Sequence, residues 1–391
     1  MTTLSNNRIE SIDLLKGLVM VIMALDHTRD YFHYSAYYFD PVNPELTTLP
    51  IYFTRWITHF CAPAFSFLAG LSAYLVGRRK STKELSAFLF KRGLWLVIIE
   101  FTIVNFAWYF DTQFRVIDLR VIWVLGISMI FLSALIYLPK KLILIISCVL
   151  IFCHNLLDTI HFKESIIWSL LHEPGPLSKA SDGIIWFVAY PIIPWIAVMS
   201  LGYFLGLLYD KSFDGAKRKS ILKIIGFTSI GLFLLLNYLN IYGDTYKWKH
   251  YENSLQTIMS FFNPNKYPPS LMYLLMTLGP VFLLLAYSEK IKGKVVNFFS
   301  VFGRVPFFYY IIHLYVIHFI ALLVAEFTGF GWEKMILRDW LTELPEMKGF
   351  GFSLVVVYVI WIFIIAMLYP ICKWFDEYKM KHKDKWWLSY L

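Results

Sequence analysis

Residues 351–373, GFSLVVVYVIWIFIIAMLYPICK, decide the fold class of this chain. Their only charged residue is Lys373, at the very end of the stretch. About 20 consecutive apolar residues are enough for an α-helix to cross the hydrocarbon core of a bilayer. We therefore expect this stretch to be a transmembrane helix.

The whole chain shares this apolar character. It has 391 residues, of which 58% are hydrophobic and only 16% are charged, and its mean hydropathy is +0.58. With 35 Phe, 25 Tyr and 14 Trp it is neither a disordered nor a collagen-like chain. The net charge of +9 would suggest nucleic acid as a partner of a soluble domain. In this chain we expect the cations to face membrane lipid, with no nucleic acid bound.

Further apolar stretches of similar length occur along the sequence. A scan for runs that can cross a bilayer gives about ten candidates. They lie near residues 11–32, 51–77, 91–110, 120–138, 142–158, 184–208, 220–241, 268–288, 300–325 and 351–373. The sequence therefore predicts an all-α, polytopic integral membrane protein of about ten transmembrane helices, with residues 1–391 forming a single transmembrane domain.

The distribution of cations between these stretches predicts the orientation. Cytoplasmic loops of membrane proteins are enriched in Lys and Arg. Alternate connections are rich in cations, and these are Arg78 to Arg92, Lys140 and Lys141, Lys211 to Lys223, Lys290 to Lys294 and the tail from Lys373 to Lys385. The first connection, by contrast, has no Lys or Arg between Phe32 and Pro50. We therefore expect both termini to be cytoplasmic.

The four cysteines and the first apolar stretch carry no processing or metal signal. Cys61, Cys148, Cys153 and Cys372 lie in apolar surroundings and lack the short paired spacings of a zinc site. We interpret them as packing residues and expect no metal. The first stretch ends in charged residues instead of a small-residue cleavage site, so we expect it to remain in the mature protein.

Polar residues cluster at the end of the first predicted helix. Asp26 and Asp30 are spaced i, i+4, and His27 can reach Asp30 at i, i+3. At about 1.5 Å per residue, His27 lies roughly 20 Å beyond Asp13, in the outer part of the bilayer. A histidine beside two carboxylates has the composition of an oriented general base. The alternative is an interfacial charge cluster that caps the end of a helix.

Other polar residues occur in the second, sixth and ninth predicted helices. Arg55 and His59 are spaced i, i+4 at a depth similar to that of His27, and can share its pocket or serve only as a snorkelling cation and a buried histidine. Pro191 and Pro194 predict a kink in the sixth helix or freed carbonyls that line a cavity. The ninth helix carries Arg304 near the cytoplasm, and its His313 falls near mid-membrane.

Several of these residues lie in stretches that resemble one known family. The six blocks, in order along nearly the whole chain, are RIESIDLLKG at 8–17 with MALDHTRD at 23–30, TRWITHFCAPAFSFLAG at 54–70, WVLGISM at 123–129, YPIIPW at 190–195, KYPPS at 266–270 and GRVP at 303–306 continuing to His313. Together they resemble the bacterial membrane proteins grouped with heparan-alpha-glucosaminide N-acetyltransferase, whose architecture is similar to that of the broader transmembrane acyltransferases.

The resemblance implies transfer of an acetyl group from cytoplasmic acetyl-CoA to an amino sugar or glycan at a bacterial inner membrane. In the lysosomal relative the catalytic histidine lies farther along the segment between the first two helices, where this chain has no aligned histidine. Assigning the role to His27 follows the acyltransferase-3 pattern, whose histidine ends the first helix. Asp26 or Asp30 would hold the tautomer of His27, and His59 or Arg55 would steady the thioester oxygen. Direct transfer and an acetyl-histidine intermediate both remain open.

Because acetyl-CoA is anionic, we expect the cytoplasmic entrance of its binding site to be lined by cations. We expect Arg304, Arg78 and Arg79 to contact the phosphates of acetyl-CoA, with His313 also on the donor side. A homodimer is one assembly that the sequence allows.

The competing function is a small-solute or sugar transporter that uses intramembrane His and Asp residues without acyl transfer. A structural or sensory membrane protein is a third alternative.

Overall fold

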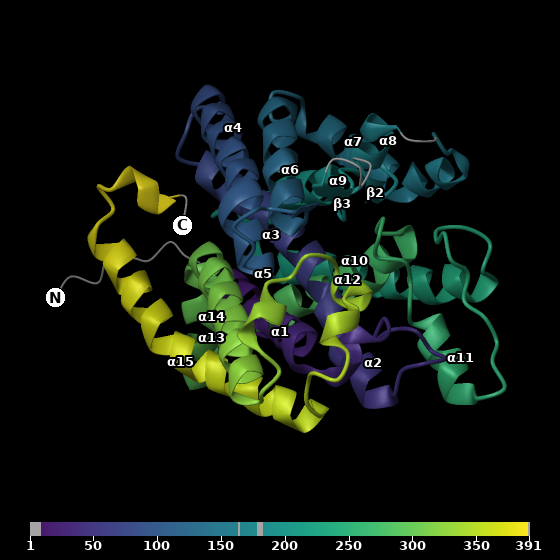
Figure 1. The fold of residues 1–391 in the computed structure, drawn as a ribbon. Helices are drawn as coiled ribbons and strands as arrows, with labels where there is room; N and C mark the ends of the chain where they lie inside the picture. Colours follow the sequence, from purple (N-terminus) through teal and green to yellow (C-terminus); the bar gives the residue numbers. More distant parts are fainter. Residues whose placement is uncertain (1–8, 163–164, 178–182, 390–391) are drawn as a thin grey trace.

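The computed structural model describes residues 9–162, 165–177 and 183–389, and these residues are mainly helical (Figure 1). The longer helices are α1 (Glu10–Phe32), α3 (Cys61–Gly77), α4 (Thr82–Ile99), α6 (Val121–Leu135), α7 (Lys140–Cys153), α9 (Trp195–Leu205), α10 (Gly215–Leu239), α12 (Leu271–Ser288), α13 (Lys294–Arg304), α14 (Pro306–Phe327) and α15 (Leu354–Lys381). Shorter ones are α2 (Leu49–Trp56), α5 (Asn105–Tyr109), α8 (Ile166–Leu171) and α11 (Ser254–Phe261).

A small sheet departs from the all-α expectation. Strand β3 (Ile185–Val188) pairs in parallel with β1 (Val116–Leu119) and antiparallel with β2 (Gly175–Pro176). β3 lies inside the stretch 184–208, which we predicted to be one helix. Its IWFV sequence is aromatic and β-branched, which suits a strand, and the helix α9 begins only at Trp195. Pro191 and Pro194 therefore precede the helix and do not kink it.

Among the residues that the structure describes, six helical segments are long and apolar enough to span a membrane. They are Leu49–Gly77, Lys140–Thr159, Gly215–Leu239, Leu271–Ser288, Pro306–Phe327 and Leu354–Lys381. The segment Leu49–Gly77 runs through α2, the 3-10 turn η2 (Ile57–Phe60) and α3. Two shorter apolar helical segments, Val121–Leu135 and Trp195–Tyr209, lie where further spans were predicted. The protein is thus a helical membrane protein, and the count of ten spans and the orientation of the termini remain predictions.

The predicted ninth span, 300–325, is divided into two helices. α13 ends at Arg304 and α14 begins at Pro306, with Val305 between them at φ −129° and ψ 48°. A proline in the first turn of a helix lacks only an N–H that would be unpaired there, but it prevents the preceding residue from continuing a helix. The break leaves Arg304 at the end of one helix and His313 within the next.

Glycines allow the close helix crossings that hold the bundle together. A Cβ added to Gly17 of α1 would lie 1.7 Å from the carbonyl oxygen of Phe299 in α13, and one added to Gly303 would lie 1.8 Å from that of Asp13. A Cβ added to Gly70 of α3 would likewise lie 1.8 Å from the backbone oxygen of Met199 in α9. In a membrane, the association of helices depends on close contact between their backbones, because lipid is as apolar as the side chains and burying apolar surface gives no advantage.

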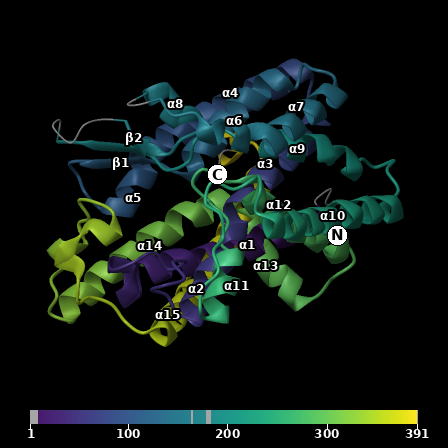
Figure 2. The ribbon, with the colours of Figure 1, turned by 90° about the vertical axis from the view of Figure 1, so that its right-hand side faces the viewer.

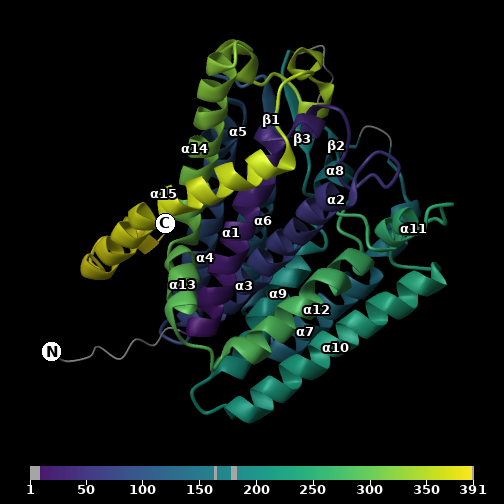
Figure 3. The same ribbon diagram turned by 90° about the horizontal axis from the view of Figure 1, so that it is seen from below.

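Helix α1 lies in the middle of the bundle. It packs against α3, α12, α13, α14 and α15, and Figure 3 shows it beside α3 and α14. α10 and α12 lie side by side along another flank (Figure 2). The sheet and α5 lie near the C-terminal end of α14, at the opposite end of the bundle from α13 (Figure 3). The polar C-terminal end of α1 is therefore held inside the protein, away from lipid.

Candidate functional site

The site centres on a contact between two buried histidines. Nδ1 of His27 lies 2.8 Å from Nε2 of His313 on α14, and the two ring planes are nearly parallel, 13° apart, with centroids separated by 5.0 Å. The rings of Trp108 in α5 and His27 are steeply inclined, at 75°, and their centroids lie 4.7 Å apart. Nδ1 of His313 lies 2.8 Å from the carbonyl oxygen of Tyr309, one turn earlier. His313, which we expected on the donor side, thus contacts the proposed base directly.

The carboxylates next to His27 bond to arginines and not to the histidine. Asp26 forms an ion pair with Arg55 of α2 and has Nη2 of Arg29 at 3.1 Å. Asp30 pairs with Arg29 on the same helix. No hydrogen bond between either carboxylate and His27 occurs in the described part of the chain. The expected orienting role of Asp26 or Asp30 therefore finds no contact here, because a guanidinium fork is the stronger partner for a carboxylate.

His59 lies in η2, near the charges of this cluster. Its side chain is buried, its Nδ1 has no hydrogen-bond partner, and its ring packs edge-on against Tyr273 at 5.6 Å. The hydroxyl of Tyr273 donates to the backbone oxygen of His59 at 2.7 Å, which fixes this turn. A buried imidazole nitrogen without a partner is costly unless a ligand or water uses it.

A cavity of about 350 Å³ opens beside the C-terminal end of α1. Its lining combines three arginines with several aromatic rings and carboxylates, and includes Arg29, Asp30, Tyr31, Asp40, Arg55, Trp108, Tyr109, Arg120, Tyr267, Asp339 and Trp340. We call this the arginine–aromatic pocket. Within its wall, Nε and Nη1 of Arg29 are buried and have no hydrogen-bond partner. Aromatic faces beside guanidinium and carboxylate groups are suited to a polar molecule that has apolar faces, such as a sugar ring.

The strand β1 helps to build one side of the arginine–aromatic pocket. Asp118 on β1 accepts from Nη2 of Arg120 at 2.6 Å and from the hydroxyl of Tyr109 at 2.5 Å. The guanidinium of Arg120 lies 4.1 Å from the centre of the Trp108 ring. These contacts hold Trp108 between Arg120 and His27, so the sheet that the sequence did not predict positions an aromatic wall of the site.

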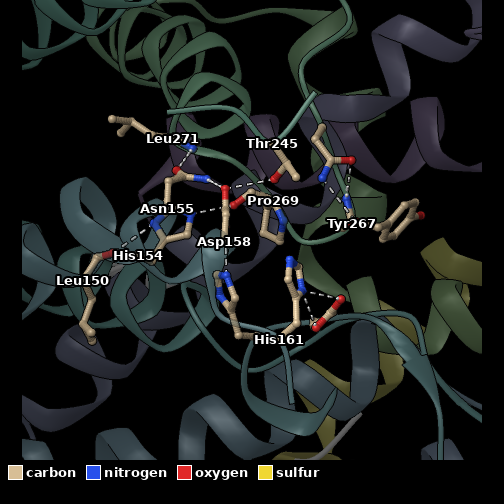
Figure 4. Close-up of polar contacts among 12 residues, drawn as sticks. Leu150, His154, Asn155, Asp158, His161, Thr245, Tyr267, Pro269 and Leu271 are labelled. Atoms are coloured by element: carbon tan, nitrogen blue, oxygen red, sulfur yellow. Dashed lines mark hydrogen bonds and ion pairs between the residues drawn. The ribbon is translucent and has the colours of Figure 1, made fainter. Parts of the chain in front are cut away.

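The segment 265–270 (Figure 4) brings Tyr267 into the lining of the same pocket. Its end is fixed by Nε2 of His154, which donates to the oxygen of Pro269 at 2.9 Å, and by Asn155, which accepts from the Leu271 amide at 2.9 Å. Asp244 accepts from the Asn265 amide at 3.0 Å and the Ser270 hydroxyl at 2.9 Å. Burial raises the pKa of Asp244 to about 6.

A second cavity, of about 400 Å³, lies toward the N-terminal end of α1. Its apolar walls include Met20, Met23, Phe65, Phe307 and Tyr310, and its charged residues are Asp13, Lys16, Arg92, Arg304 and Lys379. We call it the basic pocket. Lys16 donates to the hydroxyl of Ser72 at 2.7 Å, and Arg304 bonds to Asp376 at 2.6 Å. Four cations above apolar walls are suited to a ligand with an anionic head and an apolar arm.

One stripe of α1 connects the two cavities. Asp13, Lys16, Met20 and Met23 line the basic pocket, and the same three- and four-residue spacing continues to His27 and then to Asp30 and Tyr31 of the arginine–aromatic pocket. Met23 and Asp30 are separated by about 10 Å along the helix. On α14, Tyr310 lines the basic pocket one turn before His313. The histidine pair therefore lies between the two cavity linings along α1 and α14, and neither His27 nor His313 is itself part of either lining.

The predicted donor contacts fall in different places. Arg304 lines the basic pocket, whereas Arg78 and Arg79 do not. Nε of Arg78 lies 3.5 Å from Asp210, its Nη1 donates to the Tyr209 oxygen at 3.1 Å, and Arg79 is exposed. Sequence reasoning did not assign site roles to Lys16, Arg92, Lys379, Trp108 or Arg120. The i, i+3 and i, i+7 spacing of Asp13, Lys16 and Met20 on α1 was a signal that could have identified Lys16.

The comparison with protein families gives one match, which covers residues 8–241. The matching family is described as heparan-alpha-glucosaminide N-acetyltransferase, catalytic. The chain belongs to this family. None of the curated proteins matches it. The matched region includes His27, Arg55, His59 and Arg120, whereas Arg304 and His313 follow it. The protein is thus a member of a membrane acetyltransferase family, and no group of three metal-binding side chains occurs among its described residues.

Proposed function

We propose that this protein transfers the acetyl group of acetyl-CoA to an amino sugar or glycan through His27, in the inner membrane of a bacterium. The observation that carries the proposal is the place of His27 between two cavities of different character. The family match supports acyl transfer as the reaction class.

The basic pocket is the proposed donor site. Lys16, Arg92, Arg304 and Lys379 would bind the phosphates of acetyl-CoA at its mouth, and the apolar wall formed by Met20, Met23 and Phe65 would hold the pantetheine arm. The thioester would then lie near His27, one helical turn beyond Met23. The arginine–aromatic pocket is the proposed acceptor site, where the partly exposed guanidinium groups of Arg55 and Arg120 can donate to sugar oxygens.

The chemistry follows from this placement. His27 takes a proton from the amine or hydroxyl of the acceptor as that atom attacks the thioester carbonyl, the C–S bond breaks, and the proton then passes to the CoA thiolate. In the alternative path, His27 attacks first and carries the acetyl group as acetyl-histidine. Arg55 or His59 would stabilise the negative charge that develops on the carbonyl oxygen. Both paths use the same histidine and the same two pockets.

Incubation of the purified protein with labelled acetyl-CoA and a panel of amino sugars tests the proposal. The expected result is loss of the thioester with formation of an acetylated sugar. Unchanged acetyl-CoA together with sugar uptake into proteoliposomes would support the transporter alternative. Neither transfer nor uptake would leave a structural or sensory role.

The proposed orientation has its own test. Ser212 lies in an exposed turn before α10, and Lys249 is exposed in the connection after it. In a cysteine-free background, a membrane-impermeant thiol reagent applied from outside should label Lys249→Cys but not Ser212→Cys. The reverse pattern would place the basic pocket outside and overturn delivery of the donor from the cytoplasm.

A further inference from the structure

The contact of His313 with Tyr309 fixes one proton. A carbonyl oxygen can only accept a hydrogen bond, so Nδ1 of His313, 2.8 Å from the Tyr309 oxygen, carries a proton and donates it. His313 is fully buried within a membrane-spanning helix, and the nearby carboxylates Asp26 and Asp30 are paired with arginines. A charged imidazolium without an acidic partner is costly in such a place. His313 is therefore neutral, and its Nε2 has a lone pair.

The second proton follows from the first. Because Nε2 of His313 is an acceptor, Nδ1 of His27, 2.8 Å away, must be the donor. A neutral imidazole has one N–H, so Nε2 of His27 has the free lone pair. No hydrogen bond to this Nε2 occurs among the described residues. The chain from Tyr309 through His313 to His27 thus selects one tautomer of His27.

We infer that His313 is a positioning residue, which holds His27 in the Nδ1–H tautomer so that Nε2 of His27 is the atom that acts in transfer. This inference rests on the proposed function of His27. It assigns to a histidine of α14 the orienting role that the neighbouring carboxylates were expected to have. It also replaces the donor-side role that the sequence suggested for His313.

The proton balance of the step keeps His313 unchanged. The proton that Nε2 of His27 takes comes from the amine or hydroxyl of the acceptor, and it leaves to the CoA thiolate. While His27 is positively charged, its Nδ1–H bond to His313 becomes charge-assisted and hence stronger. His313 retains its own proton on Nδ1, and this N–H stays hydrogen-bonded to the Tyr309 oxygen throughout.

Two substitutions of His313 separate positioning from mere packing. The amide of Gln can place an oxygen where Nε2 of His313 lies, so His313→Gln keeps an acceptor for His27. The shorter amide of Asn reaches the position of Nδ1, so His313→Asn keeps a donor toward Tyr309 but loses the acceptor. Both variants remain polar and similar in size. His318→Gln is the matched control, because His318 is also buried on α14 but lies 2.9 Å and 2.7 Å from the backbone oxygens of Ala107 and Met335.

The experiment measures kcat and the KM for acetyl-CoA of each folded variant with the sugar that the wild type acetylates. His313→Asn should lower kcat by about 10²-fold, which is within the range expected when a general base is in the wrong tautomer. His313→Gln should retain kcat within about tenfold of wild type, and His318→Gln should match wild type. The KM for acetyl-CoA should be unchanged in all three. If His313→Asn does not fold, His313→Leu, which also lacks an acceptor for His27, replaces it in the comparison with His313→Gln.

The outcomes distinguish the two proposals. Wild-type kcat in His313→Asn, or equal loss in the Asn and Gln variants, overturns the positioning role while an inactive His27→Ala variant leaves the proposed function intact. Absence of transfer by the wild type, or full turnover by His27→Ala, overturns the proposed function and the role of His313 with it. Loss of activity in His318→Gln as large as in His313→Asn would assign the effect to packing of α14.

Discussion

Nδ1 of His27 and Nε2 of His313 lie 2.8 Å apart although 286 residues separate them in the chain. The contact joins the polar end of α1 to the middle of α14, between a basic cavity and an arginine–aromatic one. It is made possible by the break at Pro306, after which α14 begins as a separate helix beside α1. The contact between the two histidines therefore depends on the packing of α1 against α14 as well as on the identity of the two residues.

The ion pair of Asp26 with Arg55 should be important for both folding and turnover. Arg55→Met leaves the buried Asp26 with only Arg29, and breaking a buried pair in this way costs about 3–5 kcal/mol of stability. If Arg55 also stabilises the developing charge, kcat should fall by about 10² to 10³ with acetyl-CoA binding retained. Denaturation in detergent and steady-state kinetics measure the two effects.

A more exposed pair provides the comparison for that prediction. Arg78 lies 3.5 Å from Asp210, and both side chains are about a third exposed, at 27% and 32%. Arg78→Met should lower the free energy of unfolding by no more than about 1 kcal/mol, as is usual for surface pairs.

A double variant tests the coupling of the buried pair. Asp26→Asn, Arg55→Met should be less destabilised than the two single losses added together. Additive losses would show that the two residues are not coupled.

The cations of the basic pocket should determine donor affinity. Lys16→Gln and Arg304→Gln each remove a cation from the cavity lining, so each should raise the KM for acetyl-CoA by about tenfold, or about 1.4 kcal/mol. kcat at saturating donor should change little. Arg79→Gln, on an exposed residue outside this lining, should leave the KM unchanged. A rise in KM for Arg79→Gln alone would place the phosphates outside the basic pocket.

Local patterns in the sequence predicted the helices well and the partners of the site residues poorly. Each of the ten apolar stretches contains a helical segment in the structure, because helix formation in a membrane depends on local hydrophobicity. The i, i+3 and i, i+4 rule placed Asp26 and Asp30 next to His27 but could not show that Arg55 and Arg29 would take both carboxylates. The pairing of β1 with β3 joins residues about 70 positions apart, such as Ile117 and Trp186, which local periodicity does not reveal.

The crossing of α1 and α13 should tolerate no side chain at Gly17. A Cβ at this position would lie 1.7 Å from the oxygen of Phe299, so Gly17→Ala forces the two helices apart. Overpacking of this kind costs about 1–3 kcal/mol, and displacement of α13 should also raise the KM for acetyl-CoA through Arg304. Gly231→Ala in α10 is the control, since nothing lies within 4 Å of its added Cβ. Gly17→Ala should therefore unfold at a lower temperature than Gly231→Ala. Equal midpoints of thermal unfolding for the two variants would contradict the tight crossing of α1 and α13.

His27 is the residue on which the proposed chemistry depends most. His27→Ala removes the imidazole that lies on α1 between the two cavity linings, so acetyl transfer should be lost while acetyl-CoA still binds in the basic pocket. If His27 were only an interfacial cap, the variant would unfold at a lower temperature but keep its turnover per folded molecule. Melting temperature, acetyl-CoA binding and turnover, all measured on one preparation, distinguish these results.

His33 supplies the matched control for this last test, because it follows α1 directly and its side chain caps the next turn, η1 (Tyr34–Tyr37). Its Nδ1 accepts from the Ser35 amide at 3.2 Å, whereas Nδ1 of His27 lies against His313. His33→Ala should therefore lower the melting temperature, since loss of such a cap typically costs about 1 kcal/mol, and retain wild-type turnover per folded molecule. Asp30→Asn should also retain more activity than His27→Ala, because Asp30 bonds to Arg29 and leaves the imidazole in place. Full turnover in His27→Ala would remove this histidine from the mechanism and direct attention to His59, whose buried Nδ1 has no partner.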